Sequence, residues 1–421
     1  MSIEDLPLVS VQADWDEVIR EVSSSMVPES SFWVACYRTG HESVQGSVEV
    51  RRTETNDVEL EGKEGIQVVK LNSRSFKINC EALGIKDITV YSPKTTLNPA
   101  ESKPISCIDI SPNGHLFAAA IGNEVNLGHM ANGQIQMKLT GHLADVTTVQ
   151  FFPSNLVVLT GGADFLVKIW SVLNGSNPVT LKGHTSAITS TAIIAQGRNV
   201  LSSSRDGTVR LWNCGTSSTI ATIGRYSSSV NKMILTSLPS CFAPAENVTL
   251  DPLEVETSDK LVLCALEDGS VRGIHLGTKE EIFATSPSQV PLTALAYDSQ
   301  TNTLLTGNAQ GLVQVYTVDE TKTLDQPQRQ WKRNGHAITG LLVTLDQNGE
   351  RVVCVSAGDG SIFQTNSLSD LLDSTKQVQV LTELTGNELE TVYEIKAVSN
   401  LKESESQRVV CAVRDGKIRI Y

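Results

Sequence analysis

Short runs of alternating hydrophobic and polar residues extend through most of the chain. The clearest runs cover residues 146–151, 157–159 and 167–169, and turn-forming residues such as Pro153 and Gly161 separate them. A period of two predicts β-strands that bury one face, and closely spaced turns join such strands into antiparallel meanders. We therefore predict an all-β protein that is built from small, four-stranded sheets.

This strand pattern repeats along the chain with a fixed offset. The dipeptide Gly141-His142 recurs as Gly183-His184, and Trp170 recurs as Trp212, in each case 42 positions later. A repeat of about 40 residues is typical of the blades of a β-propeller, in which each blade is a four-stranded meander.

Weaker copies of the repeat continue to the C-terminus. An Asp-Gly turn returns at Asp268, Asp359 and Asp415. We place the starts of seven repeat units near residues 105, 141, 183, 224, 289, 334 and 389. Seven units predict a seven-bladed WD-repeat β-propeller over residues 86–421, preceded by a small, β-rich, non-repeat domain over residues 1–85.

The last repeat unit ends at its third strand, at Tyr421. Another segment must supply its fourth strand if the sheet edge is not to remain free. The run Ile88–Tyr91, directly before the first unit, has strand character and is predicted to be this donor.

Two further segments do not follow the repeat. A first helix is predicted near residues 15–22 of the N-terminal domain. The fourth unit carries an insertion at residues 237–258 with three prolines and several acidic residues. This composition predicts a mobile surface loop, and we interpret it as a spacer in preference to a binding segment.

Two sets of four side chains occupy matching positions in the two clearest repeat units. The first set is His142, Thr160, Asp164 and Trp170, and the second set is His184, Ser202, Asp206 and Trp212. Buried polar groups in a crowded blade must satisfy one another, with the carboxylate accepting from imidazole, the hydroxyl bridging, and the indole N–H closing the chain. His, Ser and Asp also suggest a hydrolase triad, but an active site would not be duplicated at identical spacing. We therefore predict a structural role for all eight residues.

Charge and cysteine content narrow the function classes. The 421 residues include 47 acidic and 34 basic ones, and the net charge of -13 opposes binding to nucleic acid and suits a basic protein partner. The eight cysteines show no Cys-x-x-Cys spacing, which predicts free thiols in a reducing compartment and no metal site. No apolar run approaches the roughly 20 residues of a membrane helix, and the first ten residues lack a signal-peptide pattern. We expect a cytoplasmic and nuclear protein that binds neither membrane nor nucleic acid.

The repeat resembles the WD-repeat family, and the match is specific over residues 141–223. Within it, the segments Val149–Ser154, Lys168–Ser171 and 196–212 are more particular, and they resemble the proteasomal ATPase-associated factors, WD-repeat chaperones of proteasome regulatory-particle assembly. This resemblance implies a partner, the C-terminal small domain of one proteasomal AAA+ ATPase subunit in base assembly intermediates. It also implies a task, which is to delay docking of the immature ATPase ring on the proteolytic core. We expect no cofactor and a chain that is monomeric by itself.

Charged residues in the turns are the candidate contacts for such a partner. The tight turns and the loops that lead into each blade are expected on one face of the ring. The hypothesised contacts on that face are the anions Glu267, Asp268, Glu388 and Glu390, with Arg205 and Arg414 as complementary cations. The alternative is that each of them is only a solvated turn residue.

The main alternative function keeps the fold: a substrate receptor of a cullin-type ubiquitin ligase, or another peptide-binding scaffold. Such receptors resemble one another in a Trp-Asp-x-Arg end to a repeat, whereas Trp170 is followed here by Ser171 and Trp212 by Asn213. An enzyme is disfavoured, because the chain has no phosphate loop, no Gly-x-Ser-x-Gly elbow and no His-Glu-x-x-His motif. A reader of histone tails or phosphopeptides would need an aromatic or basic central mouth, and only 5% of the residues are aromatic.

Overall fold

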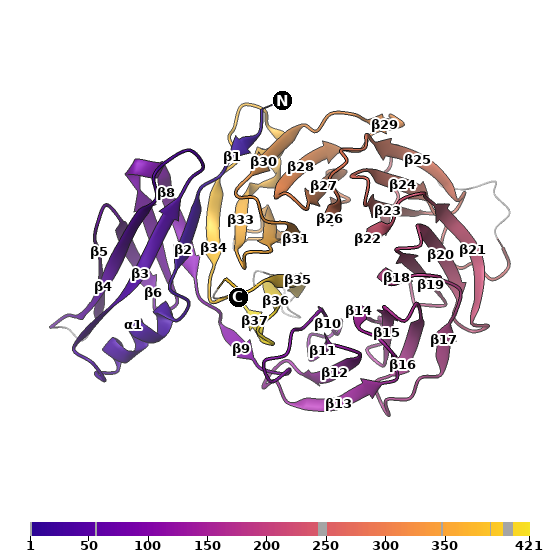
Figure 1. Cartoon of the computed structure of the whole chain (residues 1–421), viewed down its shortest axis with the longest axis horizontal. Helices are drawn as coiled ribbons and strands as arrows, with labels where there is room; N and C mark the ends of the chain where they lie inside the picture. The colour runs from indigo at the N-terminus through magenta and orange to yellow at the C-terminus, as the bar shows by residue number, and fades with distance from the viewer. Residues whose placement is uncertain (1, 55–56, 243–250, 347, 388, 399–406) are drawn as a thin grey trace.

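The computed structural model describes residues 2–54, 57–242, 251–346, 348–387, 389–398 and 407–421. Figure 1 shows a ring of small, radially arranged sheets, viewed along its axis, with a β-rich unit at one side. The described residues form seven blades, each with four antiparallel strands. The predicted all-β, seven-bladed propeller is therefore confirmed.

Blades 1 to 4 follow one another in chain order, each from its innermost to its outermost strand. Blade 1 contains β10 (Cys107–Ile110), β11 (Leu116–Ile121), β12 (Glu124–His129) and β13 (Ile135–Thr140). Blade 2 contains β14 (Val146–Phe151), β15 (Val157–Gly162), β16 (Val167–Ser171) and β17 (Val179–Leu181). Blade 3 contains β18 (Ile188–Ile194), β19 (Asn199–Ser204), β20 (Thr208–Asn213) and β21 (Ser218–Arg225). Blade 4 contains β22 (Val230–Ser237), β23 (Lys260–Leu266), β24 (Val271–His275) and β25 (Glu280–Thr285), and β29 (Thr323–Leu324) extends it.

Blades 5 to 7 each include or receive a strand from a distant part of the chain. Blade 5 contains β26 (Leu292–Asp298), β27 (Thr303–Asn308), β28 (Leu312–Thr317) and β30 (Arg329–Lys332), and β1 (Glu4–Asp5) pairs with its outer edge. Blade 6 contains β31 (Ile338–Leu345), β32 (Arg351–Ala357), β33 (Ile362–Ser367) and β34 (Val380–Leu384), with helix α2 (Leu368–Leu372) between the last two. Blade 7 contains β35 (Val392–Val398), β36 (Arg408–Val413), β37 (Ile418–Ile420) and β9 (Thr95–Leu97).

The second strands of the blades are buried on both faces, because each blade packs against its two neighbours. All six residues of β19 are buried, and so are all six residues of β27. The outer strand β13, in contrast, alternates between exposed and more buried positions. A strand that is buried on both faces has a continuous run of small, apolar and hydroxyl residues in its sequence. Alternation of polar and apolar residues is therefore clear only in strands that have one face exposed to water.

The ring closes through β9, which pairs antiparallel with β37 in the register Leu97 to Ile418. The prediction that Ile88–Tyr91 supplies this strand is therefore wrong by a few residues. That segment lies in β8 (Ile85–Tyr91), which is paired on both edges, to β7 (Ser75–Cys80) and to β34. The side chains of Ile88 and Val90 are buried in the core of the N-terminal domain, so the chain must continue past Pro93 before it reaches blade 7.

The N-terminal domain contains two sheets and one helix. One sheet is formed by β2 (Leu8–Val11), β3 (Glu29–Tyr37), β4 (Val44–Arg52) and β5 (Val58–Gly62), and the other by β6 (Gln67–Asn72), β7 (Ser75–Cys80) and β8, with a short 3-10 helix, η1 (Glu81–Leu83), before β8. Helix α1 (Trp15–Ser23) buries Trp15, Val18, Ile19 and Val22 against these sheets, and Trp15 packs edge-on to Phe76. The strand-rich domain and its first helix match the sequence-based expectation.

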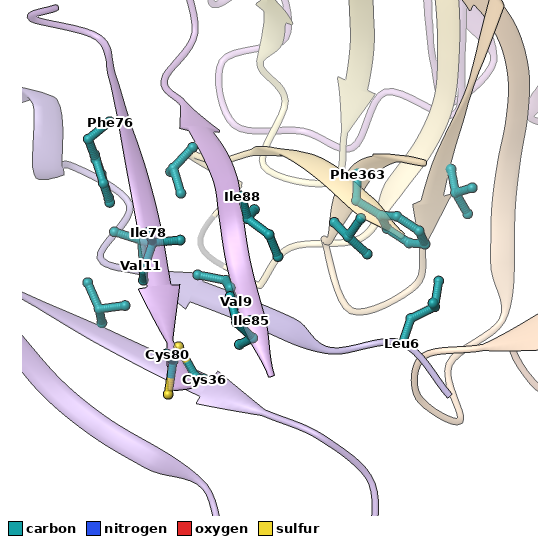
Figure 2. Close-up of a cluster of buried hydrophobic side chains, with 14 of the residues drawn as sticks. Leu6, Val9, Val11, Cys36, Phe76, Ile78, Cys80, Ile85, Ile88 and Phe363 are labelled. Carbon is teal, nitrogen blue, oxygen red and sulfur yellow. The ribbon is translucent and has the colours of Figure 1, made fainter. Parts of the chain in front are cut away.

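The N-terminal domain and blade 6 share one hydrophobic core. Strand β8 pairs in parallel with β34, and the buried cluster runs from Phe76 and Ile78 through Ile88 to Phe363 of blade 6. Figure 2 shows side chains from both sides of this junction, and in that view Ile88 lies between Ile78 and Phe363. Because β8 hydrogen-bonds to both units, the boundary expected at residue 85 stays a prediction.

The insertion in blade 4 is held to the ring where the structure describes it. Val255 N donates to Asn199 Oδ1 at 2.7 Å, and the buried Glu254 forms an ion pair with Lys279 at 2.7 Å. On the other side, the ring of Phe242 stacks on Phe283. Residues 251–258 are thus attached to the ring by Asn199 of blade 3, a contact that composition cannot reveal. Residues 243–250 lie outside the described residues, and the mobility of the insertion stays a prediction.

Candidate interaction face of the ring

Successive strands of each blade run in opposite directions. The turn between the second and third strands and the loop that leads into each blade's first strand therefore emerge on one face of the ring, which we call the loop face. Backbone hydrogen bonds join these two kinds of segment: Ala163 N donates to Asp145 O at 2.7 Å, and Gly358 N donates to Ala337 O at 2.9 Å. The candidate contact residues that the structure describes belong to such segments: Arg205, Glu267, Asp268, Glu390 and Arg414.

Blade 2 brings its four predicted residues into one chain of hydrogen bonds. His142 Nδ1 lies 2.9 Å from Asp164 Oδ2, and His142 Nε2 lies 2.8 Å from Thr160 Oγ1. Trp170 Nε1 donates to the same hydroxyl at 2.8 Å. Asp164 also accepts from the backbone N–H of Leu143 at 3.0 Å, so the carboxylate fixes the loop that leads into the blade.

Blade 3 repeats this arrangement. His184 Nδ1 lies 2.9 Å from Asp206 Oδ2, His184 Nε2 lies 2.8 Å from Ser202 Oγ, and Trp212 Nε1 donates to Ser202 Oγ at 2.8 Å. The backbone N–H of Thr185 donates to Asp206 at 2.9 Å. The same contacts at the same spacing hold both blades, and both hydroxyls are fully buried, so a substrate could not reach them.

Burial lowers the pKa of His142 and of His184, although the adjacent carboxylates act in the opposite direction. Burial alone would raise the pKa of Asp206, but hydrogen bonds from Thr208, Thr185 and His184 lower it overall. At neutral pH both imidazoles are therefore neutral, and the hydrogen bonds that Asp206 accepts keep its carboxylate charged.

Three other turns of the loop face, on blades 4, 6 and 7, use an acidic residue to close the turn itself. Asp268 accepts from Ser270 N at 2.9 Å and from its hydroxyl at 2.7 Å, and Asp359 does the same with Ser361 at 3.1 and 2.7 Å. Asp415 accepts from Lys417 N at 3.0 Å. These carboxylates are therefore partly engaged by their own turns.

The hypothesised contact residues form two groups on the loop face. On blades 3 and 4, Ser229 joins Arg205 to Glu267, because its hydroxyl donates to Arg205 O and its carbonyl accepts from Glu267 N. The next residue, Asp268, donates its N–H to Ser228 Oγ at 3.0 Å. On blade 7, Arg414 Nε lies 3.8 Å from Glu390. Glu388 lies outside the described residues.

Sequence reasoning selected charges and missed apolar side chains on the same face. Leu143 is 87% exposed and Phe165 is 43% exposed, and they flank the Asp164 carboxylate of blade 2. Phe165 has φ +68°, where the matching residue of blade 3 is Gly207 with φ +76°. The available signal was a phenylalanine after the turn aspartate, at a position where a left-handed backbone favours glycine.

The described residues contain neither a metal centre nor a membrane helix. Nowhere in this part of the chain do three or more His, Cys, Asp or Glu side chains gather in a way that could hold a metal ion. The described helices are also too short or too polar to cross a membrane.

Seven closed blades, two of them held by the same hydrogen-bonded tetrad, define this chain as a WD-repeat β-propeller. The family model "WD domain, G-beta repeat" matches residues 133–171 and 175–213.

Three curated relatives carry one description. The chain is 30% identical over 148 residues to Proteasomal ATPase-associated factor 1 of Homo sapiens and 31% identical over 148 residues to the protein of that name from Gallus gallus. It is 27% identical over 159 residues to Probable proteasomal ATPase-associated factor 1 of Dictyostelium discoideum. These matches cover 35%, 35% and 37% of this chain and 36%, 36% and 35% of the relatives, so the chain spans about a third of the length of the curated relatives it matches. Over that third, the resemblance to the proteasomal ATPase-associated factors is confirmed.

Proposed function

We propose that this chain is a proteasome-assembly chaperone, which binds the C-terminal small domain of a proteasomal AAA+ ATPase subunit and delays its docking on the core particle. The observation that carries the proposal is the 30% identity over 148 residues to a protein named for association with proteasomal ATPases. On this proposal the chain is a monomeric binding platform without catalysis or cofactor, and it works in the cytoplasm and the nucleus.

The loop face supplies suitable contacts for a folded protein domain. Leu143 and Phe165 are exposed apolar side chains on blade 2, while Arg205 and Glu267 are exposed charges on the two blades that follow. Apolar anchors surrounded by charges are typical of protein interfaces, in which the charges set orientation and association rate. The net charge of -13 favours a basic partner surface.

The direct test measures binding between the purified chain and each isolated C-terminal domain of the proteasomal ATPase subunits by biolayer interferometry. One domain is expected to bind, and more weakly at high salt because charges contribute. Phe165→Gly and Glu267→Lys are each expected to weaken that binding by about tenfold. Leu173→Asp is the matched control, because Leu173 is 74% exposed but lies in a turn on the opposite face.

A second measurement tests the delayed docking. ATPase base particles that carry the chain are expected to sediment without core particles, and removal of the chain restores co-sedimentation. Failure of all ATPase domains to bind overturns the proposal, as does binding that neither loop-face variant weakens. Recovery of cullin adaptors from cell extract in place of ATPases assigns the ring to a ubiquitin ligase.

A further inference from the structure

A groove lies between the N-terminal domain and blade 6, at the edge of the loop face, with a volume of about 340 Å³. One wall is the continuous segment 8–14, which includes strand β2. The other wall consists of the turn 359–362 and the segment 383–387, where the chain leaves blade 6. Trp33 and Leu389 complete the lining. A main-chain stretch of this length can present hydrogen-bonding groups to an extended ligand.

Strand β2 is an edge strand. Within the described part of the chain, its ladder partner is β3 and its other edge carries no strand. Gln12 N donates to Trp33 O on β3 at 3.1 Å. Backbone groups of successive residues in a strand point to opposite edges, so those of Val9 and Val11 point away from β3 and towards the groove. Val9 N confirms this direction, because it donates across to Glu383 Oε1 at 3.4 Å. An unpaired strand edge is a template for one more strand.

Two exposed apolar side chains accompany this edge. Trp33 is 47% exposed and Leu389 is 75% exposed. Leu389 also has φ +64°, a left-handed backbone conformation that is unfavourable for any residue with a Cβ atom. The isolated chain gains little burial in return for this conformation, and such strain is characteristic of binding sites.

The charged side chains that line the groove, among the described residues, are all acidic: Asp14, Asp359 and Glu383. Arg333 neutralises Glu383 in a buried ion pair. Asp14 is exposed, and with Asp359 it gives the groove a negative charge.

We propose that this groove binds an extended, basic peptide segment of a partner protein. The peptide adds a short strand along the edge of β2 from Val11 onwards, beyond the Val9 N–H that Glu383 occupies. Its hydrophobic side chains contact Trp33 and Leu389, and its Lys or Arg side chains lie opposite Asp14 and Asp359. Backbone hydrogen bonds supply affinity, and alternate side chains supply specificity. This site adjoins the blade 7 contacts of the loop face, because Leu389 directly precedes Glu390, but it is separate from the loop-face contacts on blades 2 to 4 that the ATPase-domain variants test.

Fluorescence anisotropy with labelled eight-residue peptides tests the proposal on the full chain. The probe alternates Lys with Leu or Val, a second peptide replaces each Lys with Glu, and a third carries N-methyl groups on alternate backbone nitrogens so that it cannot extend a sheet. The Lys peptide is expected to bind, and the Glu peptide and the methylated peptide to bind at least about tenfold more weakly. Leu389→Asp and Trp33→Ala are each expected to weaken binding of the Lys peptide by a similar factor.

Two control variants separate this groove from the loop face. Leu173→Asp and Glu267→Lys are expected to leave peptide binding unchanged. Of the two ligands, Glu267→Lys is expected to weaken only the binding of the ATPase domain. If Trp33→Ala does not fold by circular dichroism, Leu389→Asp decides, because Leu389 lies in an exposed loop. Equal binding of the Glu or methylated peptide overturns the proposal, and so does binding that Leu389→Asp does not change. A dimer in sedimentation velocity that Leu389→Asp dissociates also overturns it, by assigning the groove to a second copy of the chain.

Discussion

Phe165 occupies a turn position that is glycine in five other blades. Those glycines are Gly207, Gly269, Gly311, Gly360 and Gly416, with φ between +76° and +88°. At all five of them an added Cβ would lie closer than 3.0 Å to a backbone atom, for example 2.3 Å from Tyr226 O at Gly207. Blade 2 has a large aromatic side chain in the same left-handed conformation, so folding alone does not account for it.

Phe165→Gly is therefore expected to affect stability and binding in opposite directions. Relief of the left-handed strain leaves the free energy of unfolding unchanged or raises it by up to about 1 kcal/mol, while the loss of the ring weakens binding of the ATPase domain. Urea denaturation and biolayer interferometry measure the two effects. Gly207→Phe is the reverse control and is expected to lower the free energy of unfolding by more than about 2 kcal/mol. A clear loss of stability in Phe165→Gly would show that the ring serves the fold.

The buried histidines predict how stability depends on pH. His142 and His184 have lowered pKa values in the folded chain, so the unfolded chain binds more protons as the pH falls through the ordinary histidine value of about 6.5. The contribution of these two histidines to the free energy of unfolding is therefore fully present above about pH 7 and decreases towards pH 5. Urea denaturation at pH 7, 6 and 5 measures this decrease, and a His142→Gln, His184→Gln double variant should show a smaller one. An equal decrease in that variant would assign the effect to other groups.

Among the strands, β9 and β8 show what a pattern can and cannot specify. Both segments alternate in the way that a half-buried strand requires, and both precede the first blade. The sequence correctly predicted that a segment before the first blade closes blade 7. It assigned this role to residues 88–91, whereas the closing strand in the structure is Thr95–Leu97. The choice depends on Ile88 and Val90, which complete the core of the N-terminal domain.

Local hydrogen exchange distinguishes these two strands. Leu97 is buried against blade 7, so Leu97→Asp is expected to increase amide exchange in β37, its ladder partner. Val90→Asp is expected to increase exchange in β34 instead, because β8 pairs with blade 6. Exchange in β37 that responds to Val90→Asp and not to Leu97→Asp would contradict the observed closure. Mass-spectrometric exchange on both variants and the unmodified chain provides the measurement.

The blades and the tetrads were predictable because they repeat. Two copies of Gly-His, Asp and Trp at one offset constrain each other, and the structure brings His142 and Asp164 together at 2.9 Å as that pattern requires. The apolar residues of the loop face were missed although Phe165 carried a signal, because attention went to the charged turn residues. The groove was not predictable, since it depends on segments far apart in the sequence. Leu389 and Trp33, for instance, line one groove although more than 300 residues separate them. A single sequence carries no periodicity that links such positions.

The whole molecule is held as one unit by the junction between the ring and the N-terminal domain. Arg333 of blade 5 forms a buried ion pair with Glu383 of blade 6, and its guanidinium lies 4.4 Å from the Phe363 ring centroid. Arg333 Nε donates to Pro7 O at 2.8 Å, and Val9 N donates to Glu383. One pair of charges thus connects two blades and the N-terminal segment, inside a hydrophobic core that both units share.

Breaking this pair from one side leaves a charge without a partner in an apolar environment. Arg333→Met is therefore expected to lower the free energy of unfolding by about 3–5 kcal/mol, and the double variant Arg333→Met, Glu383→Leu to recover most of that loss, because it removes the stranded carboxylate. Urea denaturation followed by tryptophan fluorescence and by circular dichroism measures both values. The tryptophans report on both units, because Trp15 and Trp33 lie in the N-terminal domain and Trp170, Trp212 and Trp331 lie in the blades. Both probes should therefore give one coincident transition in the unmodified chain if the shared core makes the two units unfold together. A loss below about 1 kcal/mol in Arg333→Met, or separate transitions for the two probes, would show that the domain and the ring are independent units.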